Sequence, residues 1–329
     1  MAKIDVAVAM GGYSREIEIS IQSGMVVCAS LNTSIYAAYP VHILKDGWFH
    51  VSEDGTRYAV DMGDFSFSDG AAIIHPKVVF NTVHGTPGED GYLASYFELL
   101  GIPQTSSPLY PAALSFNKRD SLTVLKHFGI KCANSYYVNK GMKIDTEIIV
   151  KTVGLPCFVK PSRAGSSFGI SKVHTLEELI PAIEKAYEED PEVIIETALA
   201  GTEVSVGVFQ NKEELIALPV TEIVTENDYF DYEAKYLGKS DEITPARISE
   251  EETTAVQNIS KNIYNLLNMS GITRSDFIIQ EGVPYFIEIN STPGLSEESI
   301  VPKQAREAGM ELSELFGILV EQALYELKS

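Results

Sequence analysis

The spacing of apolar and polar positions predicts two strand–loop–helix units early in the chain. The apolar run in "KIDVAVAMGG" ends at a glycine pair, and a helix is expected to begin near Ser14, with Glu16 in its first turn. In "KVVFNTVHGTPGEDGYLASYFELLGI" a strand should end at His84 and a helix begin near Glu89 or Asp90. The repeated unit predicts a small, Rossmann-like α/β domain with a mostly parallel sheet.

The pattern changes after this part. The stretch "GIPQTSSPLYPAAL", dense in proline and serine, predicts a domain boundary close to residue 104. A helix through "LSFNKRDSLTVLKHFGI" precedes a strand, a loop of small residues and a returning strand in "LPCFVKPSRAGSSFGISKV", and "LEELIPAIEKAYEEDPE" predicts an amphipathic surface helix. After "VIIETALAG" the pattern indicates antiparallel strands and a last helix. We expect three domains, 1–104, 105–196 and 197–329, the last of α+β type.

A hairpin is predicted in "DFIIQEGVPYFIEIN", residues 276–290. A three-residue turn would pair Gln280 with Pro284 and set Asp276 opposite Glu288, with Asn290 on the same face. Two carboxylates this close are destabilising unless a cation lies between them, and hard oxygen ligands suit Mg²⁺ or Mn²⁺. A surface hairpin with solvated acids is the alternative for this segment alone.

The loop "KPSRAGSSFG" has features of a phosphate site. Lys160 ends a strand, and Gly165, Ser166, Ser167 and Gly169 leave backbone N–H groups accessible, so the loop could wrap phosphate oxygens that the lysine neutralises. The spacing matches neither the P-loop pattern nor the dinucleotide-binding glycine pattern. An ordinary hairpin connection is the alternative.

Other charged positions are weaker candidates. Glu196 and Glu203, near a strand end, could accept from an adenine amino group and a ribose hydroxyl, or serve as edge-strand charges. Lys118 alone indicates a surface lysine. Lys235 and Tyr236 lie in the irregular stretch "FDYEAKYLGKS", which is either a lid or a surface loop.

Arg274 and His84 each have two interpretations. Arg274 lies two residues before Asp276 and shares its face, so its guanidinium could stabilise a developing negative charge, form an ion pair with Asp276 or Glu288, or do both. His84, at the mouth of a loop, could bind a metal ion but is expected instead to form hydrogen bonds as a neutral side chain. No second histidine stands at a spacing suited to a shared metal.

Composition narrows the class of protein. The formal net charge of −21 argues against a surface for nucleic acid or anionic membrane. No apolar run reaches the roughly eighteen residues that a membrane span needs, and no basic leader precedes the first strand. Cys28, Cys132 and Cys157 are an odd number without CxxC spacing, as expected of reduced thiols. We expect a cytoplasmic enzyme.

Five segments, in order, closely resemble the D-alanine:D-alanine ligases of the ATP-grasp superfamily. They are "GGYSREIEISIQSG", "HGTPGEDG", "FVKPSRAGSSFGISKV", "DYEAKY" and "YFIEINSTPGLSEESIVPKQAREAGM". The resemblance implies an ATP-grasp architecture and an enzyme that converts ATP and D-alanine into a D-alanyl phosphate, then couples it to a second D-alanine for peptidoglycan precursor synthesis. It also implies a homodimer.

The resemblance assigns positions to ATP and to two Mg²⁺ or Mn²⁺ ions. They are Lys118 and Lys160 for phosphates, Glu196 and Glu203 for adenine and ribose, Ser167 and Lys235 elsewhere in the nucleotide site, and Asp276, Glu288 and Asn290 for the metal ions.

It also assigns positions to the two D-alanines. They are Glu16 for the first ammonium, His84 lining that subsite, Ser166 and Tyr236 for closing the lid with Glu16, Arg274 and the Gly294 backbone for the oxyanion, and Ser299 for the second carboxylate.

The chain departs from the family pattern in places. Ile17 stands where many relatives have arginine, and Ile300 replaces a common leucine beside Ser299. D-serine or D-lactate are alternative acceptors. Tyr236 favours an amine over D-lactate, whereas D-serine differs by one hydroxyl that a pocket rejects weakly. A nucleotide-binding module without catalytic activity is the alternative of another class.

Overall fold

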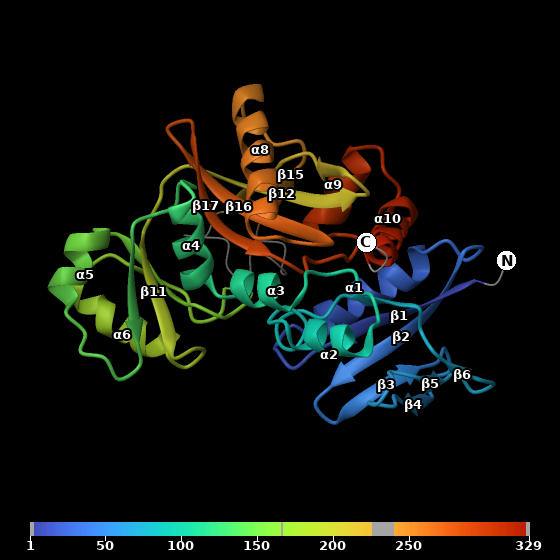
Figure 1. The fold of residues 1–329 in the computed structure, drawn as a ribbon. Helices are drawn as coiled ribbons and strands as arrows, with labels where there is room; N and C mark the ends of the chain where they lie inside the picture. Colours follow the sequence, from blue (N-terminus) through green and yellow to red (C-terminus); the bar gives the residue numbers. More distant parts are fainter. Residues whose placement is uncertain (1–2, 166, 226–239, 327–329) are drawn as a thin grey trace.

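The computed structural model describes residues 3–165, 167–225 and 240–326. The predicted site residues Ser166, Lys235 and Tyr236 lie outside the described residues. The molecule is elongated, with the N-terminal elements at one end, the middle segment at the other and the C-terminal strands and helices between and above them (Figure 1). Within the described ranges, no helix has both the length and the apolar composition to cross a membrane.

The N-terminal sheet has a parallel and an antiparallel half. Its strands, in spatial order, are β4 (Arg57–Ala59), β3 (Gly47–Val51), β2 (Tyr36–Leu44), β1 (Ile4–Gly11) and β7 (Val78–Asn81). β1 pairs in parallel with β2 and β7, whereas the pairings of β3 are antiparallel. The expected mostly parallel sheet is therefore right for one half only. The turn at Lys45 and Asp46 is too short for the crossover that parallel pairing requires.

Two helices and a small hairpin complete this part of the chain. They are α1 (Ile17–Ser30), α2 (Tyr92–Leu100), β5 (Phe67–Ser68) and β6 (Ile73–Ile74). The predicted bounds need correction: α1 begins at Ile17, β7 ends three residues before His84, and α2 begins at Tyr92. Gly91, with φ of 90°, turns the chain into α2. His84 and Glu89 consequently lie together in the loop between β7 and α2.

The middle segment contains the predicted pair of strands around a loop and the predicted surface helix, within a larger sheet with helices. Its elements are α3 (Leu109–Phe116), α4 (Lys118–His127), β8 (Ser135–Asn139), α5 (Thr146–Val153), β9 (Cys157–Pro161), β10 (Ser171–Val173), α6 (Leu176–Ala186) and β11 (Glu192–Thr197). The sheet order is β10-β9-β11-β8. The single predicted helix is divided at Asn117, whose side chain accepts a hydrogen bond from the Asp120 N–H and caps α4.

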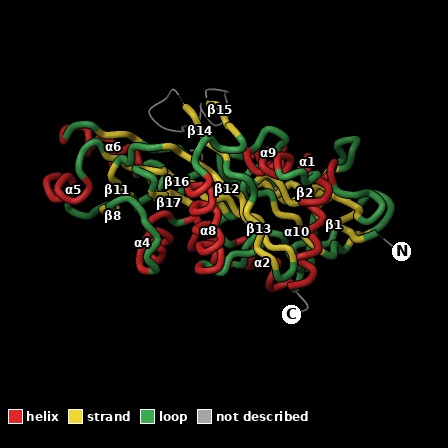
Figure 2. Tube along the Cα trace, turned by 90° about the horizontal axis from the view of Figure 1, so that it is seen from above, coloured by secondary structure: helices red, strands yellow, loops and turns green. Residues whose placement is uncertain are grey.

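The C-terminal segment is a sheet of antiparallel pairs, as expected, with three helices among the described residues. Its elements are β12 (Thr202–Asn211), β13 (Glu214–Ala217), β14 (Thr221–Thr225), β15 (Ser240–Ile243), α8 (Glu250–Leu266), β16 (Ile272–Gln280), β17 (Val283–Asn290), α9 (Ile300–Glu307) and α10 (Leu312–Glu326). Figure 2 shows α10 between the N-terminal sheet and β12. Phe316 of α10 packs against Phe80 of β7, with ring centroids 5.5 Å apart, in a core that includes Phe209 of β12.

The turn of the β16–β17 hairpin differs from the predicted one. Gln280 pairs with Val283, so the turn has two residues, Glu281 and Gly282, with φ of 54° and 75°. Both values are positive, as in the type I′ turn that matches the right-handed twist of the strands. The predicted three-residue turn was wrong.

A bulge restores the predicted pairing farther along the hairpin. Phe277 pairs with Phe286, but Asp276 pairs with Glu288, which leaves Ile287 as an extra residue on β17. Phe277 and Phe286 pack edge to face in the buried core, with centroids 5.7 Å apart. The bulge therefore keeps both phenylalanines inside while Asp276 and Glu288 face each other.

Candidate functional site

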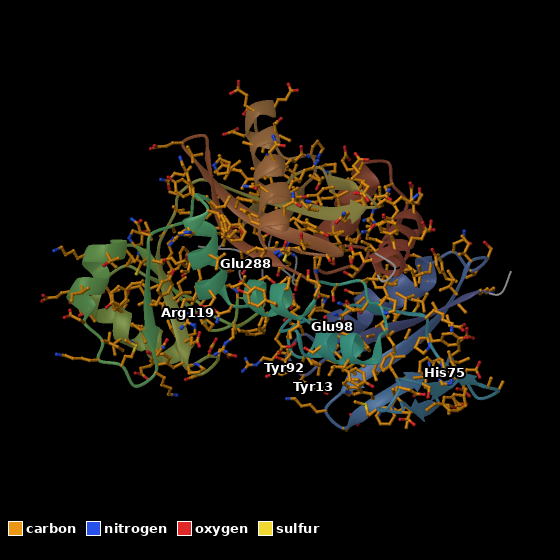
Figure 3. The ribbon with its side chains drawn as sticks, in the orientation of Figure 1. Tyr13, His75, Tyr92, Glu98, Arg119 and Glu288 are labelled. Atoms are coloured by element: carbon orange, nitrogen blue, oxygen red, sulfur yellow. The ribbon has the colours of Figure 1, made fainter. Side chains whose placement is uncertain are left out.

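Two cavities meet in the middle of the molecule. Cavity A, of about 280 Å³, lies between the loops after β7 and β9, the end of β17 and the start of α9. Cavity B, of about 100 Å³, lies between the sheets of the middle and C-terminal segments. Lys118, Ser167, Ile170 and Glu288 line both. Figure 3 shows Glu288 in the middle of the molecule. Groups bound in the two cavities would meet beside these four residues.

Cavity B combines an apolar lining with a few charges. Lys160 Nζ is 3.0 Å from Glu196 Oε2, and both side chains are largely buried. Glu203 from β12 and Phe158 from β9 also line it. A flat, weakly polar group with a few hydrogen-bonding atoms fits such a lining. Lys160, Glu196 and Glu203 are thus brought together, as the predicted nucleotide site requires.

The oxygen cluster of the hairpin is neutralised by basic side chains. Arg274 donates to Asp276 through Nε at 3.0 Å and Nη2 at 2.8 Å. Lys118 Nζ lies 2.9 Å from Glu288 Oε2, and Asn290 Nδ2 donates to Asp276 Oδ2 at 3.4 Å. The expected ion pair of Arg274 with Asp276 is confirmed. Each carboxylate thus has a cationic partner that a bound metal ion would share or replace.

The donor set fits a hard cation that keeps other ligands. Within residues 3–165, 167–225 and 240–326, no three or more His, Cys, Asp or Glu side chains are grouped to hold a metal ion. Asp276, Glu288 and Asn290 supply two carboxylates and one amide oxygen on neighbouring strands. Mg²⁺ commonly binds one or two carboxylates and completes its octahedron with phosphate oxygens and water. The set therefore fits Mg²⁺ or Mn²⁺ bound together with a nucleotide.

Lys118 is not a surface residue, which corrects the interpretation from its sequence position alone. It is the first residue of α4, its backbone N–H donates to the Ser162 carbonyl at 2.9 Å, and its Nζ donates to the Ala164 carbonyl at 3.1 Å. Burial lowers the pKa of Lys118, but the surrounding carboxylates, Glu288 first and then Glu89 and Glu196, together outweigh burial, so the pKa is raised. The charged ammonium joins the start of α4 to the loop after β9.

One wall of cavity A holds three buried titratable groups, Glu16, His84 and Glu89. Burial, followed by the nearby Glu16, raises the pKa of Glu89 to about 8, and the Gly85 N–H donates to Glu89 Oε2 at 2.7 Å. Burial also lowers the pKa of His84. Near neutral pH both are uncharged. The sequence interpretation missed Glu89 as a site residue, although it stands five positions after His84 in the same glycine-containing loop.

The opposite side of cavity A is the start of α9. Ser299 is its N-cap residue and shares a hydrogen bond of 2.7 Å with the Ser296 hydroxyl. The Gly294 backbone is close by, since a Cβ added there would lie 2.8 Å from Ser299 Oγ. Backbone N–H groups at a helix start favour a bound anion. Two buried atoms of residues that line cavity A, His84 Nε2 and Thr292 Oγ1, have no hydrogen-bond partner among the described residues.

The described part of the chain therefore gathers the predicted site residues around two adjoining cavities. Those on cavity A are Glu16, His84, Lys118, Ser167, Arg274, Glu288, Asn290, Gly294 and Ser299, and those on cavity B include Lys160, Glu196, Glu203 and Asp276. Besides Glu89, the sequence interpretation missed Ser205, whose hydroxyl donates to Asp276 Oδ1 at 2.6 Å from the neighbouring strand. Only the register of β12 against β16 brings Ser205 there.

Family models match both halves of the chain. The model described as D-ala D-ala ligase N-terminus matches residues 5–107, and the one described as D-ala D-ala ligase C-terminus matches residues 124–321. The D-alanine–D-alanine ligase of Christiangramia forsetii is 55% identical over 322 residues, which cover 98% of this chain and 99% of that protein.

Solved structures agree over the full length. The VanG D-Ala:D-Ser ligase from Enterococcus faecalis superposes with a TM-score of 0.85 at 31% identity, covering 98% of this chain and 100% of that one. The D-alanine–D-alanine ligase from Bacillus anthracis complexed with ATP gives a TM-score of 0.80 at 27% identity and 99% coverage of both chains. The expected fold class is confirmed.

Proposed function

Because the chain belongs to the D-alanine–D-alanine ligase family, we propose that it joins two D-alanine molecules into D-alanyl-D-alanine while ATP is cleaved to ADP and phosphate. The observation that supports this most strongly is the meeting of cavities A and B at Lys118 and Glu288. A carboxylate in one and a triphosphate in the other would come into contact there. The product would serve peptidoglycan precursor synthesis in the cytoplasm.

The first step would be phosphoryl transfer. With adenine beside Glu196 and ribose beside Glu203, the phosphates would extend toward Lys160 and Lys118. Glu16 would hold the ammonium of the first D-alanine. The carboxylate of that D-alanine would then face the residues that line both cavities. A carboxylate oxygen attacks the γ-phosphorus, the bond to ADP breaks, and an acyl phosphate forms. The two lysines disperse the charge of the transferring group.

Metal ions would assist at the same place. We assign Asp276, Glu288 and Asn290 as the side chains that would hold two Mg²⁺ or Mn²⁺ ions with the nucleotide. When bound, the ions neutralise charge on the phosphates. Ser205 supports this set, because its hydroxyl and the Arg274 guanidinium fix the Asp276 carboxylate from two sides.

The second step would be aminolysis. Ser299 and the start of α9 would bind the carboxylate of the second D-alanine. Its amine, after losing a proton, attacks the acyl carbonyl, the C–O bond to phosphate breaks, and phosphate leaves. Arg274 and the Gly294 N–H would stabilise the tetrahedral oxyanion. Acyl phosphates hydrolyse readily, so water must be excluded. Ser166 and Tyr236 are proposed to close the lid with Glu16, whereas Ser167 and Lys235 are proposed to contact the nucleotide.

D-alanine is the favoured acceptor. The relatives that are more than half identical over almost the whole chain are D-alanine–D-alanine ligases. A D-serine ligase also shares the fold, at lower identity. Incubation with equal D-alanine, D-serine and D-lactate, followed by mass spectrometry, should give mainly D-alanyl-D-alanine. Mainly D-alanyl-D-serine or the depsipeptide would instead establish the alternative acceptor.

The decisive test is ADP release by the purified protein with Mg²⁺-ATP and D-alanine, compared with L-alanine and with no amino acid. We expect turnover with D-alanine and a product of the mass of the dipeptide. ATP binding without ADP formation across a panel of D-amino acids would contradict the proposal. Light scattering after gel filtration would test the proposed homodimer, since a monomer and a dimer differ twofold in mass.

A further inference from the structure

A third cavity lies behind the wall of cavity A. This cavity C has a volume of about 1250 Å³, and Tyr13 and Tyr92, labelled in Figure 3, are among its lining residues. Glu16 and Gly165 line both cavities A and C, so they form part of the wall between them. Whatever holds this wall from the side of cavity C affects the side that faces the substrates.

Glu16 and Gly165 are packed without spare room. A Cβ added to Gly165 would collide with the Glu16 carboxylate. The Phe168 N–H donates to the Gly165 carbonyl at 3.2 Å, so Phe168 and Gly165 belong to one turn of the loop after β9. A displacement of Phe168 would therefore also displace the Gly165 backbone, which contacts Glu16.

Arg15 contacts this turn from the N-terminal segment. Its guanidinium lies over the Phe168 ring, 5.0 Å from the centroid, and its Nη2 is 3.3 Å from Glu189 Oε1. Phe168 and Glu189 both belong to the middle segment and both line cavity C. Arg15 does not line cavity A or B, so it contacts neither substrate site. It therefore connects the N-terminal segment to the middle segment next to Glu16.

We propose that Arg15 is a positioning residue: by binding Phe168 and Glu189, it holds the Gly165 backbone against Glu16 and keeps the ammonium site in register with the phosphate site. The inference rests on the proposed ligase function. The side chain that follows Glu16 is the apolar Ile17, which leaves Arg15 as the basic side chain adjoining Glu16 in sequence.

The test compares Arg15→Ala, Arg15→Lys and Glu189→Gln with a matched control, Arg57→Ala. Arg57 makes the same two kinds of contact, with Phe49 at 5.4 Å and Asp46 at 3.7 Å, but within the N-terminal sheet region. Its loss therefore removes a similar cation–π contact and ion pair without uncoupling two parts of the chain. For each protein we would measure kcat, the KM for ATP and for the first D-alanine, and the ratio of ADP to dipeptide.

Arg15→Ala should lower kcat/KM for D-alanine by about threefold to thirtyfold, the range for one cation–π contact and one exposed ion pair. The KM values should rise, and more than one ADP should form per dipeptide, because water reaches the acyl phosphate through a loosened wall. Arg15→Lys should recover part of the loss. Glu189→Gln should have a smaller effect, and none when Arg15 is already alanine.

Two results would overturn the positioning role. One is Arg15→Ala with the KM values and the ADP-to-dipeptide ratio of the parent, even if kcat falls, since lost folded enzyme lowers kcat alone. The other is an equal change in Arg57→Ala. Dipeptide formation by the parent, measured first, tests the ligase function separately, so an inactive parent and an unaffected variant are distinguishable outcomes.

Discussion

Glu288, which lines both cavity A and cavity B, interacts with two other side chains. Glu288 faces Asp276 across the hairpin and binds the Lys118 ammonium from another element. A carboxylate there can therefore serve the nucleotide, its cations and the lysine at once. Replacing its charge while keeping its volume isolates that contribution.

Glu288→Gln should lower the rate of dipeptide formation by about 10²- to 10³-fold, the usual loss when a group that organises transition-state charge is removed. The measurement is D-alanine-dependent ADP release at saturating substrate. Glu184→Gln, on the exposed face of α6, removes one carboxylate elsewhere and should stay within about twofold of the parent, as expected of a surface substitution. Equal turnover by Glu288→Gln and the parent would contradict the assignment.

Glu89 makes a prediction about pH and stability. Its pKa is raised from 4.5 to about 8 in the folded protein, by burial and then by Glu16. As pH rises above 4.5, the unfolded chain loses its proton while the folded carboxyl keeps it, so the folded state loses stability up to about pH 8. Glu89→Gln cannot ionise, and its free energy of unfolding should exceed the parent's increasingly between pH 5 and 8, by roughly 2–4 kcal/mol at the upper end.

Urea denaturation of the two proteins at pH 5, 6.5 and 8 measures this difference. A constant difference across the range would show that Glu89 does not titrate as described. Below pH 5 the two proteins should differ only by the exchange of a hydroxyl for an amide.

Some of the site residues could be placed from the sequence and others could not. The facing of Asp276 and Glu288 was predicted correctly although the turn was not, because the bulge at Ile287 offsets the shorter turn. Lys118 was not distinguishable from a surface lysine, since its approach to Glu288 depends on the packing of α4 against β17. Glu89 was missed for a related reason: burial of a loop acid depends on distant segments that cover it.

At the scale of elements, the start of α4 decides where Lys118 lies. Asn117 ends α3, caps α4 through the Asp120 N–H, and donates from Nδ2 to Glu192 Oε2 at 3.1 Å. The residue before Lys118 thus connects the helix to β11. Its loss should affect both folding and the nucleotide site.

Asn117→Ala should lower the free energy of unfolding by about 0.5–2 kcal/mol, the usual range for a lost N-cap, and should raise the KM for ATP because the first turn of α4 frays. Asn117→Ser restores the cap but not the bond to Glu192, so it should recover most of the stability. Thermal unfolding and ATP kinetics of both variants provide the test. If Asn117→Ala lowers stability but leaves the KM for ATP unchanged, the cap stabilises the fold without positioning the nucleotide site.

Element types were predicted well and their ends were not. The periodic runs of β9, β10, α6 and α10 were recognised because each carries its own apolar pattern. The hairpin shows the limit, since the two-residue turn and the bulge alter the register in compensating ways. The packing of Phe277 against Phe286, a property of the core, selects that combination.

At the scale of the whole molecule, the N-terminal and C-terminal segments share one core. Val6, Phe80, Phe209 and Phe316 are all fully or almost fully buried in it. The proposed division into 1–104, 105–196 and 197–329 follows sheets and composition, and remains a prediction. The shared core was not foreseeable from the sequence, because α10 lies far along the chain from the strands that it covers.

Phe316→Ala should lower the free energy of unfolding by about 3–5 kcal/mol, as for other buried phenylalanines. The single tryptophan, Trp48, lies on β3, so its fluorescence follows the N-terminal sheet while circular dichroism follows the whole protein. Both signals should shift together in urea. Leu99→Ala, at a side chain 88% exposed, should change stability by less than about 0.5 kcal/mol. A shift in circular dichroism without one in fluorescence would contradict the shared core.

The position of α10 also has a consequence for biosynthesis. The ribosome releases β1, β2 and β7 long before it translates residues 312–326, which cover the face of these strands that carries Val6 and Phe80. Until then α1 packs on this face through Val27 and Leu31 but α10 does not, so the nascent N-terminal segment exposes part of an apolar surface of the kind that chaperones bind during translation. Synthesis of α10, rather than of the N-terminal strands themselves, therefore completes the core around these strands.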